Sequence, residues 1–150
     1  MDKMSFVMLR ERIETLIGSE CEGYDAIEND NALIIPSESL KDIVAMLDEI
    51  LDGVHLTTIT AQQRAGQLEW IELMYHFFQD FAFTLIVRLP AESPDIASII
   101  SILPGADFYE REVAEMFGVK FTGRSETPPM LLPDDWDQGP PFIQKEVIDE

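Results

Sequence analysis

Basic residues are scarce in this chain: 10 lysines and arginines stand against 29 aspartates and glutamates, so the formal charge at pH 7 is −19. A surface this acidic repels phosphate backbones and anionic lipid heads, which argues against binding to nucleic acid and against direct insertion into a membrane. Acids outnumber bases in each third of the chain, which indicates an acidic surface rather than an acidic tail. Such a surface favours solubility, and its carboxylates can also face a basic partner.

Other features are missing as well. No apolar run approaches the roughly 20 residues that a membrane-spanning helix needs, and no basic segment followed by an apolar one suggests a secretory signal. The single cysteine, Cys21, excludes an internal disulfide, is typical of a reducing compartment and cannot build a thiolate metal site alone. In contrast, 46% of the residues are apolar and 9% are aromatic. This composition predicts one folded domain with a substantial core.

Apolar periodicity predicts the elements of this domain. Helical spacing over residues 6–17 and 40–51 predicts two helices, the second capped by Ser37 or Ser39. Between them, residues 23–28 and 32–35 flank a turn at 29–31 and predict a short hairpin. Residues 54–61, 68–78 and 81–89 have period-two patterns and predict an antiparallel meander. The fold class that follows is α+β, with a mixed or antiparallel sheet and helices packed on one face.

Two further helices are expected after Pro90. Ser93-Pro94-Asp95 predicts the start of a short helix, whose apolar residues are Ile96, Ile99, Ile100 and Leu103. Asp107 is expected to cap the next helix, with Glu110 as its capping-box partner and Gly118 as its end. The buried face of that helix is predicted to consist of Tyr109, Val113, Met116 and Phe117.

The last stretch of the chain combines proline with large apolar residues. Five of the nine prolines lie there and predict extended backbone: Pro128, Pro129, Pro133, Pro140 and Pro141. Its apolar side chains need a surface to bury against, either this domain or another chain. We therefore expect an α+β sandwich domain at residues 1–122 and an extended Pro-rich, partner-docking C-terminal tail at residues 123–150.

Motifs for catalysis are mostly missing. The chain has no phosphate-binding glycine loop and no G-x-S-x-G elbow, and His55 and His76 stand alone in predicted strands. The pair Glu110 and Glu112 could perform acid–base chemistry, although spacing around Arg111 fits an ion-paired surface helix as well. The pair Asp134-Asp135 could perform the same chemistry or bind a metal, but two adjacent carboxylates alone are a weak signal for a site. The residues thus indicate a binding module; a free-standing acidic adaptor or inhibitor and a small hydrolase are the alternatives.

Three blocks between residues 106 and 136 carry a family pattern. They read ADFYERE at 106–112, EMFGVKFTG at 115–123 and LLPDDW at 131–136. In order and spacing they resemble the 30-kDa subunit family of respiratory complex I (NADH dehydrogenase), a subunit type that also occurs in energy-converting membrane-bound NiFe hydrogenases. Two stretches depart from the complex I form: Gly123-Arg124-Ser125 stands in place of G-H-P, and Pro128-Pro129 stands in place of a basic pair. The proline pair and the shorter chain favour the hydrogenase-type branch. A methanogen-type or quinone-reducing complex I relative is the alternative.

This resemblance implies a non-catalytic, cofactor-free peripheral-arm subunit of a membrane-bound, proton- or sodium-pumping redox complex. The implied partners are a hydrogenase-like large subunit and an iron–sulfur small subunit, which would hold the iron–sulfur clusters and any NiFe centre. The complex would keep this chain at the cytoplasmic side of the cell membrane, as part of a hetero-oligomer. Its role would be positional: it would hold the electron-transfer subunits together.

The resemblance also suggests which residues meet the partners. Glu110, Arg111 and Glu112 would order the helix or bridge to the large subunit, and Gly118 would permit a positive-φ cap. Leu132, Pro133 and Trp136 would anchor the tail. The full expected set is Glu110, Arg111, Glu112, Phe117, Gly118, Phe121, Leu132, Pro133, Asp134, Asp135, Trp136 and Phe142, with Asp134 and Asp135 facing a basic patch.

Overall fold

The computed structural model describes residues 4–23, 31–125 and 128–144. Three α-helices and two short 3-10 helices are present there: α1 (Phe6–Ile17), η1 (Ser37–Ser39), α2 (Leu40–Ile50), η2 (Pro104–Ala106) and α3 (Asp107–Phe117). The strands are β1 (Glu22–Gly23), β2 (Asn31–Ile34), β3 (His55–Arg64), β4 (Gln67–Gln79), β5 (Phe81–Pro90), β6 (Asp95–Ala97) and β7 (Lys120–Thr122). The predicted α+β class is confirmed.

The main sheet is mixed, with strand order β1-β2-β5-β4-β3. Strands β3, β4 and β5 form the predicted antiparallel meander, and β2 joins β5 in parallel. In the predicted early hairpin, Gly23 of β1 runs antiparallel to β2, and Asn31 belongs to β2 rather than to the turn. The rest of the predicted first strand and turn, residues 24–30, lies outside the described residues. Strands β2 and β5 can pair in parallel because η1, α2, β3 and β4 lie between them in the sequence and form the long connection that a parallel pair needs.

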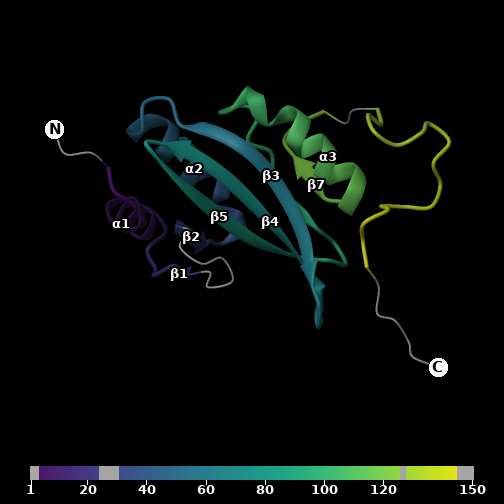
Figure 1. The fold of residues 1–150 in the computed structure, drawn as a ribbon, viewed down its shortest axis with the longest axis horizontal. Helices are drawn as coiled ribbons and strands as arrows, with labels where there is room; N and C mark the ends of the chain where they lie inside the picture. Colours follow the sequence, from purple (N-terminus) through teal and green to yellow (C-terminus); the bar gives the residue numbers. More distant parts are fainter. Residues whose placement is uncertain (1–3, 24–30, 126–127, 145–150) are drawn as a thin grey trace.

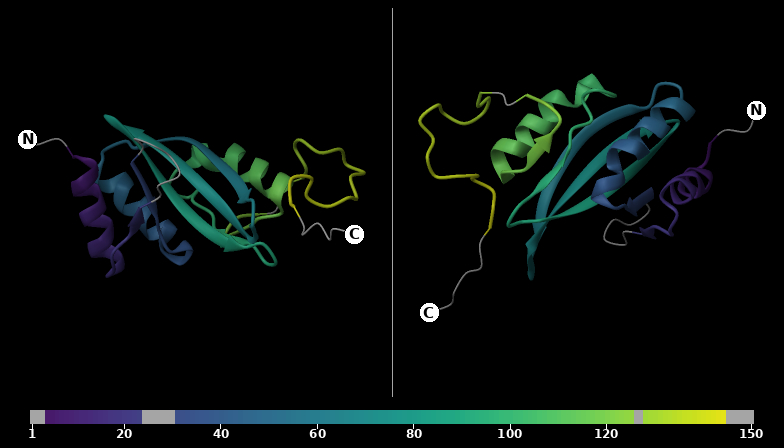
Figure 2. Two further views of the ribbon diagram at one scale, coloured as in Figure 1. Left: turned by 60° about the horizontal axis from the view of Figure 1, so that its bottom comes forward. Right: turned by 180° about the vertical axis from the view of Figure 1, so that it is seen from behind.

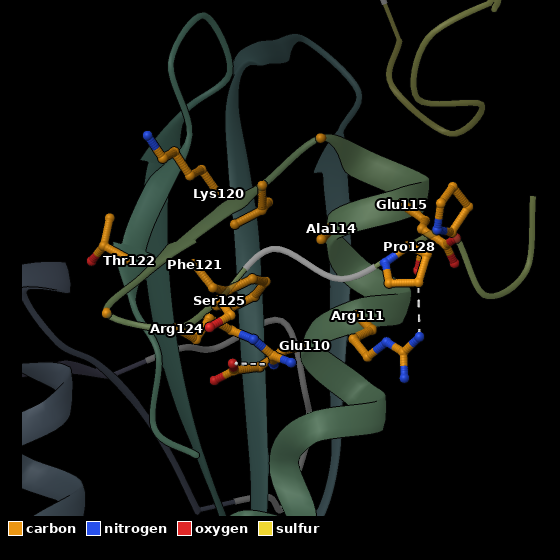
Figure 3. Close-up of a pocket in the computed structure, with 14 residues that line it drawn as sticks. Glu110, Arg111, Ala114, Glu115, Lys120, Phe121, Thr122, Arg124, Ser125 and Pro128 are labelled. Atoms are coloured by element: carbon orange, nitrogen blue, oxygen red, sulfur yellow. Dashed lines mark hydrogen bonds and ion pairs between the residues drawn. The ribbon is translucent and has the colours of Figure 1, made fainter. Parts of the chain in front are cut away.

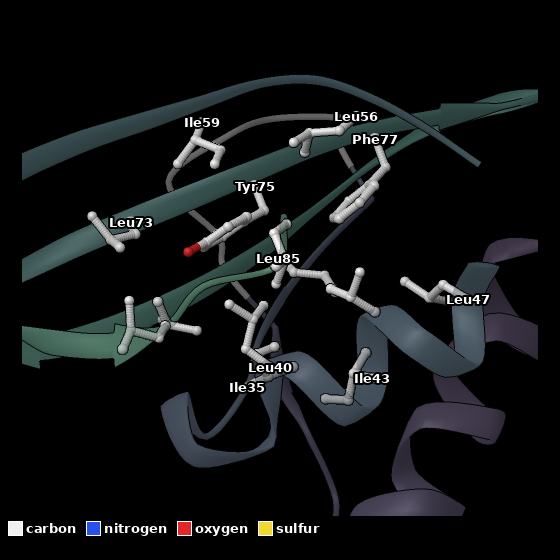
Figure 4. Close-up of a cluster of buried hydrophobic side chains, with 14 of the residues drawn as sticks. Ile35, Leu40, Ile43, Leu47, Leu56, Ile59, Leu73, Tyr75, Phe77 and Leu85 are labelled. Atoms are coloured by element: carbon white, nitrogen blue, oxygen red, sulfur yellow. The ribbon is translucent and has the colours of Figure 1, made fainter. Parts of the chain in front are cut away.

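The core lies on one face of this sheet. Alternate residues of β4 (Ile71, Leu73, Tyr75 and Phe77) are buried and face the same cluster as Leu85 of β5. Helix α2 contributes its apolar stripe to that cluster, and Figure 4 shows its leucines and isoleucine beneath the β4 side chains. Residues of α1 and α3 belong to the same cluster, so the helices pack on one face, as the sequence predicts.

The opposite face of the sheet carries polar side chains that bond across strands. His76 of β4 lies between Thr60 and Thr84, with ring-nitrogen to hydroxyl distances of 3.1 and 3.0 Å. Glu72 is buried on the same strand and accepts from the Arg88 guanidinium at 3.0 Å. Phe78, near the end of β4, is 52% exposed.

Residues 95–103 do not form the predicted helix. Residues 95–97 are strand β6, which pairs in parallel with β7 in the register Asp95↔Lys120 to Ala97↔Thr122. A single turn follows, with the Leu103 amide bonded to the Ile99 carbonyl at 2.8 Å. A buried strand residue followed by a turn produces the same apolar spacing as a short helix, and the pairing partner lies over 20 residues away, so local pattern cannot separate the two.

Two predicted caps also differ from the structure. Ser39 stands at the N-cap of α2 without a side-chain capping bond, because the 3-10 helix η1 leads directly into the helix. Helix α3 likewise follows η2, and its N-cap residue is Ala106 rather than Asp107. Only part of the predicted buried face of α3 is buried, namely Val113; Tyr109, Met116 and Phe117 are half-buried.

The elements divide between two ends of the sheet. Helices α1 and α2 lie toward one end, whereas α3 and β7 lie toward the other (Figure 1). Residues 128–144 contain no helix or strand and form a loop that projects beyond α3 (Figure 2), and the end of this loop returns to the sheet, where Gln144 bonds to Gln63 of β3. Within the described ranges, no helix is long and apolar enough to cross a membrane.

Candidate functional site

The centre of the region that carries the family pattern is a buried carboxylate, Glu110, on α3. Its side chain is 0% exposed and accepts from the Ser98 hydroxyl at 2.6 Å, the Ile99 amide at 2.9 Å and Nη1 of Arg124 at 3.0 Å. Figure 3 shows the Glu110–Arg124 contact beside the helix. Glu110 therefore joins α3 to the turn after β6 and to the segment after β7. The predicted capping-box role is wrong, because this carboxylate points to a different segment of the chain.

Arg124 is the counter-ion of this cluster. Its side chain is 9% exposed and pairs with both Glu110 and Asp107. Burial by itself would lower the pKa of the guanidinium, but the hydrogen bonds to these two carboxylates outweigh it and raise the pKa above its usual value. The group therefore stays charged at any physiological pH. In the sequence, Arg124 is distinguished only as one of few basic residues in an acidic region. This feature does not predict which carboxylates it pairs with.

Tyr75 lies in the core, close enough to Glu110 for the charge of that carboxylate to act on the Tyr75 phenol. Burial first, and then the negative charge of Glu110, raise the pKa of the Tyr75 phenol well above its usual value. Its hydroxyl has no hydrogen-bond partner within the described part of the chain. Because Glu110 is fully enclosed and bonded to three donors, its carboxylate has no open side for a substrate.

The outer side of α3 contacts the beginning of the tail. Arg111 donates from Nη2 to the Pro128 carbonyl at 3.4 Å, as drawn in Figure 3. Glu115 accepts from the amide of Met130 and, at 2.9 Å, from the amide of Leu131. The carboxylate of Glu115 thus binds two successive backbone N–H groups, which are not supplied with partners by a helix or sheet in this segment.

The C-terminal end of α3 contacts the end of the tail. Gly118 ends the helix with φ of 73°, as its predicted cap requires, and a Cβ there would lie 2.7 Å from Cγ of Pro140. The Phe142 amide donates to the Met116 carbonyl at 2.9 Å. The rings of Phe117 and Phe142 meet edge to face with their centroids 5.8 Å apart.

A cavity of about 670 Å³ lies between these contacts. It is bordered by the outer side of α3, by β7 and by the first residues of the tail, as Figure 3 shows. Charged side chains of both signs line it, among them Arg111, Glu115 and Lys120. Among the described residues, no group of three or more histidines, cysteines, aspartates or glutamates is arranged to hold a metal ion.

The predicted docking residues thus occupy four kinds of position. Glu110 and Phe121 are buried inside the domain, and Phe117 and Gly118 contact the tail. Glu112 and Leu132 are half-buried. The exposed members lie on the loop beyond α3: Pro133, Asp134, Asp135, Trp136 and Phe142.

Sequence reasoning did not assign roles to four residues that organise this region. Arg124, Ser98, Glu115 and Pro140 each contact α3 or the tail from a distant part of the sequence. The block containing Glu115 was visible as a pattern, but its partners, two backbone amides, have no sequence signature. Whether the exposed residues meet a partner chain stays a prediction.

Comparison with protein families gives one match that covers most of the chain. The family model described as "Respiratory-chain NADH dehydrogenase, 30 Kd subunit" matches residues 33–148. This range contains the main sheet from β2 onward, α3 and the tail, which are the parts that form the region around Glu110.

Individual relatives agree with this match. The C-type subunit of F(420)H(2) dehydrogenase from Methanosarcina mazei is 31% identical over 104 residues, covering 67% of this chain and 65% of that protein. The C-type subunit of NADH-quinone oxidoreductase from Roseiflexus sp. is 27% identical over 142 residues, covering 91% of this chain and 80% of that protein. The C/D-type subunit of NADH-quinone oxidoreductase from Gluconacetobacter diazotrophicus is 37% identical over 121 residues, covering 73% of this chain but only 20% of that protein.

Two solved structures share the fold. A trypsin-resistant fragment of Nqo5 superposes with a TM-score of 0.67 at 19% identity, covering 83% of this chain and all of that fragment. A chain of the membrane-bound sulfane sulfur reductase, an archaeal respiratory membrane complex, superposes with a TM-score of 0.63 at 24% identity, covering 83% of this chain and 75% of that chain. At these identities the likeness concerns the fold.

Proposed function

We propose, from the premise that this chain belongs to the family of the 30-kDa subunit of respiratory-chain NADH dehydrogenase, that it is a non-catalytic, cofactor-free subunit of a membrane-bound, ion-pumping redox complex. It holds the electron-transfer subunits together, at the cytoplasmic side of the membrane, and any iron–sulfur clusters or NiFe centre belong to its partners. The observation that carries this proposal is the exposed loop beyond α3, whose large apolar side chains Leu131, Trp136 and Phe142 are 47%, 37% and 57% exposed.

The chemistry of the region supports a structural role over a catalytic one. The single fully buried carboxylate of α3, Glu110, is bonded to protein donors on three sides and its charge is balanced by Arg124. A general acid or base needs a side open to substrate. Glu110 instead fixes three segments relative to one another, which gives the outer residues of α3 a rigid base.

The names of the relatives support a choice of direct partner for this chain and a choice between the dehydrogenase and hydrogenase sides of the family. The C/D-type relative continues far beyond the part that this chain matches, which supports a D-type chain as the direct partner; we propose that this is the hydrogenase-like large subunit. The relatives are named for NADH-quinone oxidoreductase and F(420)H(2) dehydrogenase. These names support the dehydrogenase side of the family over the hydrogenase side favoured by Pro128-Pro129.

Purification of the native complex through a tag on this chain tests the proposal. Wild-type chain should copurify with a large subunit and an iron–sulfur subunit at fixed stoichiometry. Trp136→Ala removes an indole that is 37% exposed, and an aromatic anchor of this kind contributes about 2 kcal/mol to an interface, so affinity for the complex should fall about 30-fold. Phe78→Ala, which removes an exposed ring from the far end of β4, is the matched control and should leave assembly intact.

Two outcomes would overturn the proposal. A wild-type chain that purifies alone, as a monomer whose binding to basic proteins falls steeply with salt, would favour a free acidic adaptor. Redox activity retained by the isolated chain would contradict the non-catalytic role. If the complex that carries Trp136→Ala has the same subunit stoichiometry and the same redox turnover as the wild-type complex, Trp136 is not the anchor.

A further inference from the structure

We propose that Glu115 and Gly118 are positioning residues that hold residues 131–139 as a preformed docking loop. Neither residue needs to touch the partner: each acts through the backbone of the tail. The identity of the partner rests on the function proposed above, whereas the preformed loop is a property of this chain alone. Contacts join the tail to α3 and β3 on both sides of the loop.

The first anchor is the carboxylate of Glu115. It accepts from the amides of Met130 and Leu131, at the point where the loop leaves the helix. Arg111, one turn earlier on the same side of α3, donates to the Pro128 carbonyl. A charged acceptor on two adjacent amides is stronger than a neutral hydrogen bond and also fixes the direction of the chain. The loop therefore starts from a defined position.

The second anchor lies at the end of α3, about ten residues later in the tail. Pro140 packs so closely on Gly118 that any side chain at position 118 would collide with its ring, 2.7 Å from the added Cβ. The neighbouring Phe142 amide donates to the Met116 carbonyl at 2.9 Å, which is one of the carbonyls left without a partner at a helix end. Gly118 thus has two functions: it caps the helix, and its lack of a side chain leaves room for Pro140 of the tail to pack against the helix end.

The third anchor is a side-chain amide on β3. Gln63 accepts from the Gln144 amide at 2.5 Å and donates to the Gln144 carbonyl at 3.3 Å. It binds both polar groups of one residue, as a neighbouring strand would. Gln63 lies at an irregular position of the β3–β4 pairing, where a bulged strand can redirect a side chain, here toward the tail.

The segment between the anchors is itself closed by internal bonds. The Trp136 amide donates to the Pro133 carbonyl at 3.0 Å, and the Trp136 indole donates to the Gly139 carbonyl at 2.6 Å. Trp136 and Leu131 stay 37% and 47% exposed, next to the exposed carboxylates of Asp134, Asp135 and Asp137. This combination fits a partner groove with an apolar floor and a basic rim. A loop fixed before binding loses less entropy on docking than a free tail.

Amide hydrogen exchange on the full-length chain, without any partner, tests the preformed loop. In the wild type, the amides of Met130, Leu131 and Phe142 should be protected. Glu115→Ala should speed exchange at Met130 and Leu131 by about tenfold or more, and Glu115→Gln should restore part of the protection because an acceptor oxygen remains. Glu112→Ala, on the same helix, is the matched control and should leave these amides unchanged.

Gly118→Ala tests the second anchor. Gly18, at the end of α1, has the same left-handed conformation, with φ of 75°, but no atom within 4 Å of an added Cβ, so Gly18→Ala reports the cost of the conformation alone. We expect Gly118→Ala to lose protection at Phe142 and Gly18→Ala to retain it. If Gly118→Ala does not fold, Glu115→Ala and its Gln variant still decide the proposal.

The effect on the partner is measured in the purified complex with Glu115→Ala and Glu115→Gln. Glu115→Ala should lower the affinity of the chain for the complex about tenfold, while the melting temperature of the isolated chain changes little. Loss of a residue with a merely structural role would lower both the affinity and the melting temperature. Unprotected amides in the wild type, or exchange that is equal in wild type and Glu115→Ala, would overturn the preformed loop. Protected amides in a chain that binds no partner would instead contradict the proposed function and leave the loop standing.

Discussion

At the scale of single residues, Glu110 shows how tertiary structure changes the meaning of an acidic side chain. Its sequence neighbours, Arg111 and Glu112, are those of a solvent-facing helix, yet its carboxylate is fully buried. Burial of an ion without a partner is costly, and three donors together with the charge of Arg124 offset that cost here. The cluster is therefore sensitive to the loss of either charge.

Glu110→Gln should lower the free energy of unfolding by about 3 kcal/mol, because it removes one of the two carboxylates that balance the buried Arg124 guanidinium. Glu112→Gln is the control; this half-buried neighbour should change stability by no more than about 0.5 kcal/mol. Urea denaturation followed by circular dichroism measures both values. Equal effects of the two variants would show that the buried pair adds nothing to stability.

At the scale of elements, the β4–β5 connection is the tightest turn of the sheet. Gln79 pairs with Phe81, so Asp80 alone makes the turn, with φ of 62°. An L-residue in this conformation is strained, although aspartate tolerates it better than most residues do. The turn also sets the register of the two strands that carry the core, since it fixes which residues of β4 and β5 lie opposite each other.

Replacement of Asp80 by glycine should therefore stabilise the protein by about 0.5–1 kcal/mol, through relief of the left-handed strain. Asp80→Ala, which keeps the strain and loses the polar side chain, should be less stable than the wild type. Thermal unfolding of the two variants gives the comparison. A glycine variant less stable than the alanine variant would show that the turn is not strained.

The elements also show where local pattern is sufficient. The meander and the helices at residues 6–17 and 40–50 were predictable because period-two and period-3.6 patterns continue over ten or more residues. Strand β6 was not predictable, since it has only three residues and pairs with β7, which follows more than 20 residues later. The sequence assigned its apolar residues to a helix for that reason.

At the scale of the whole molecule, the segment after β7 joins the domain to the tail. The predicted boundary lies between residues 122 and 123, whereas the side chain of Arg124 is bound to α3. A chain cut after Thr122 would retain Glu110 in its buried position without its cation. A chain cut after Ser125 would retain the pair.

A chain of residues 1–125 should consequently be more stable to urea than a chain of residues 1–122 by about 3 kcal/mol, the cost of an unpaired buried charge. A third chain, residues 1–125 with Arg124→Ala, is the matched control and should behave like residues 1–122. Equal stability of the two cut chains would place the domain boundary at residue 122, as the sequence predicts.

The sequence by itself determined the α+β class, the meander, the positive-φ cap at Gly118 and the family, because these depend on periodicity and on motifs read along the chain. Only the tertiary structure decided that Glu110 is internal, that Arg124 is its counter-ion and that Glu115 holds the tail. Each of these depends on groups 14 to 17 residues apart that meet only when α3, β7 and the tail fold together. Charge identifies such residues as candidates, but burial and direction, which give them their roles, arise from packing.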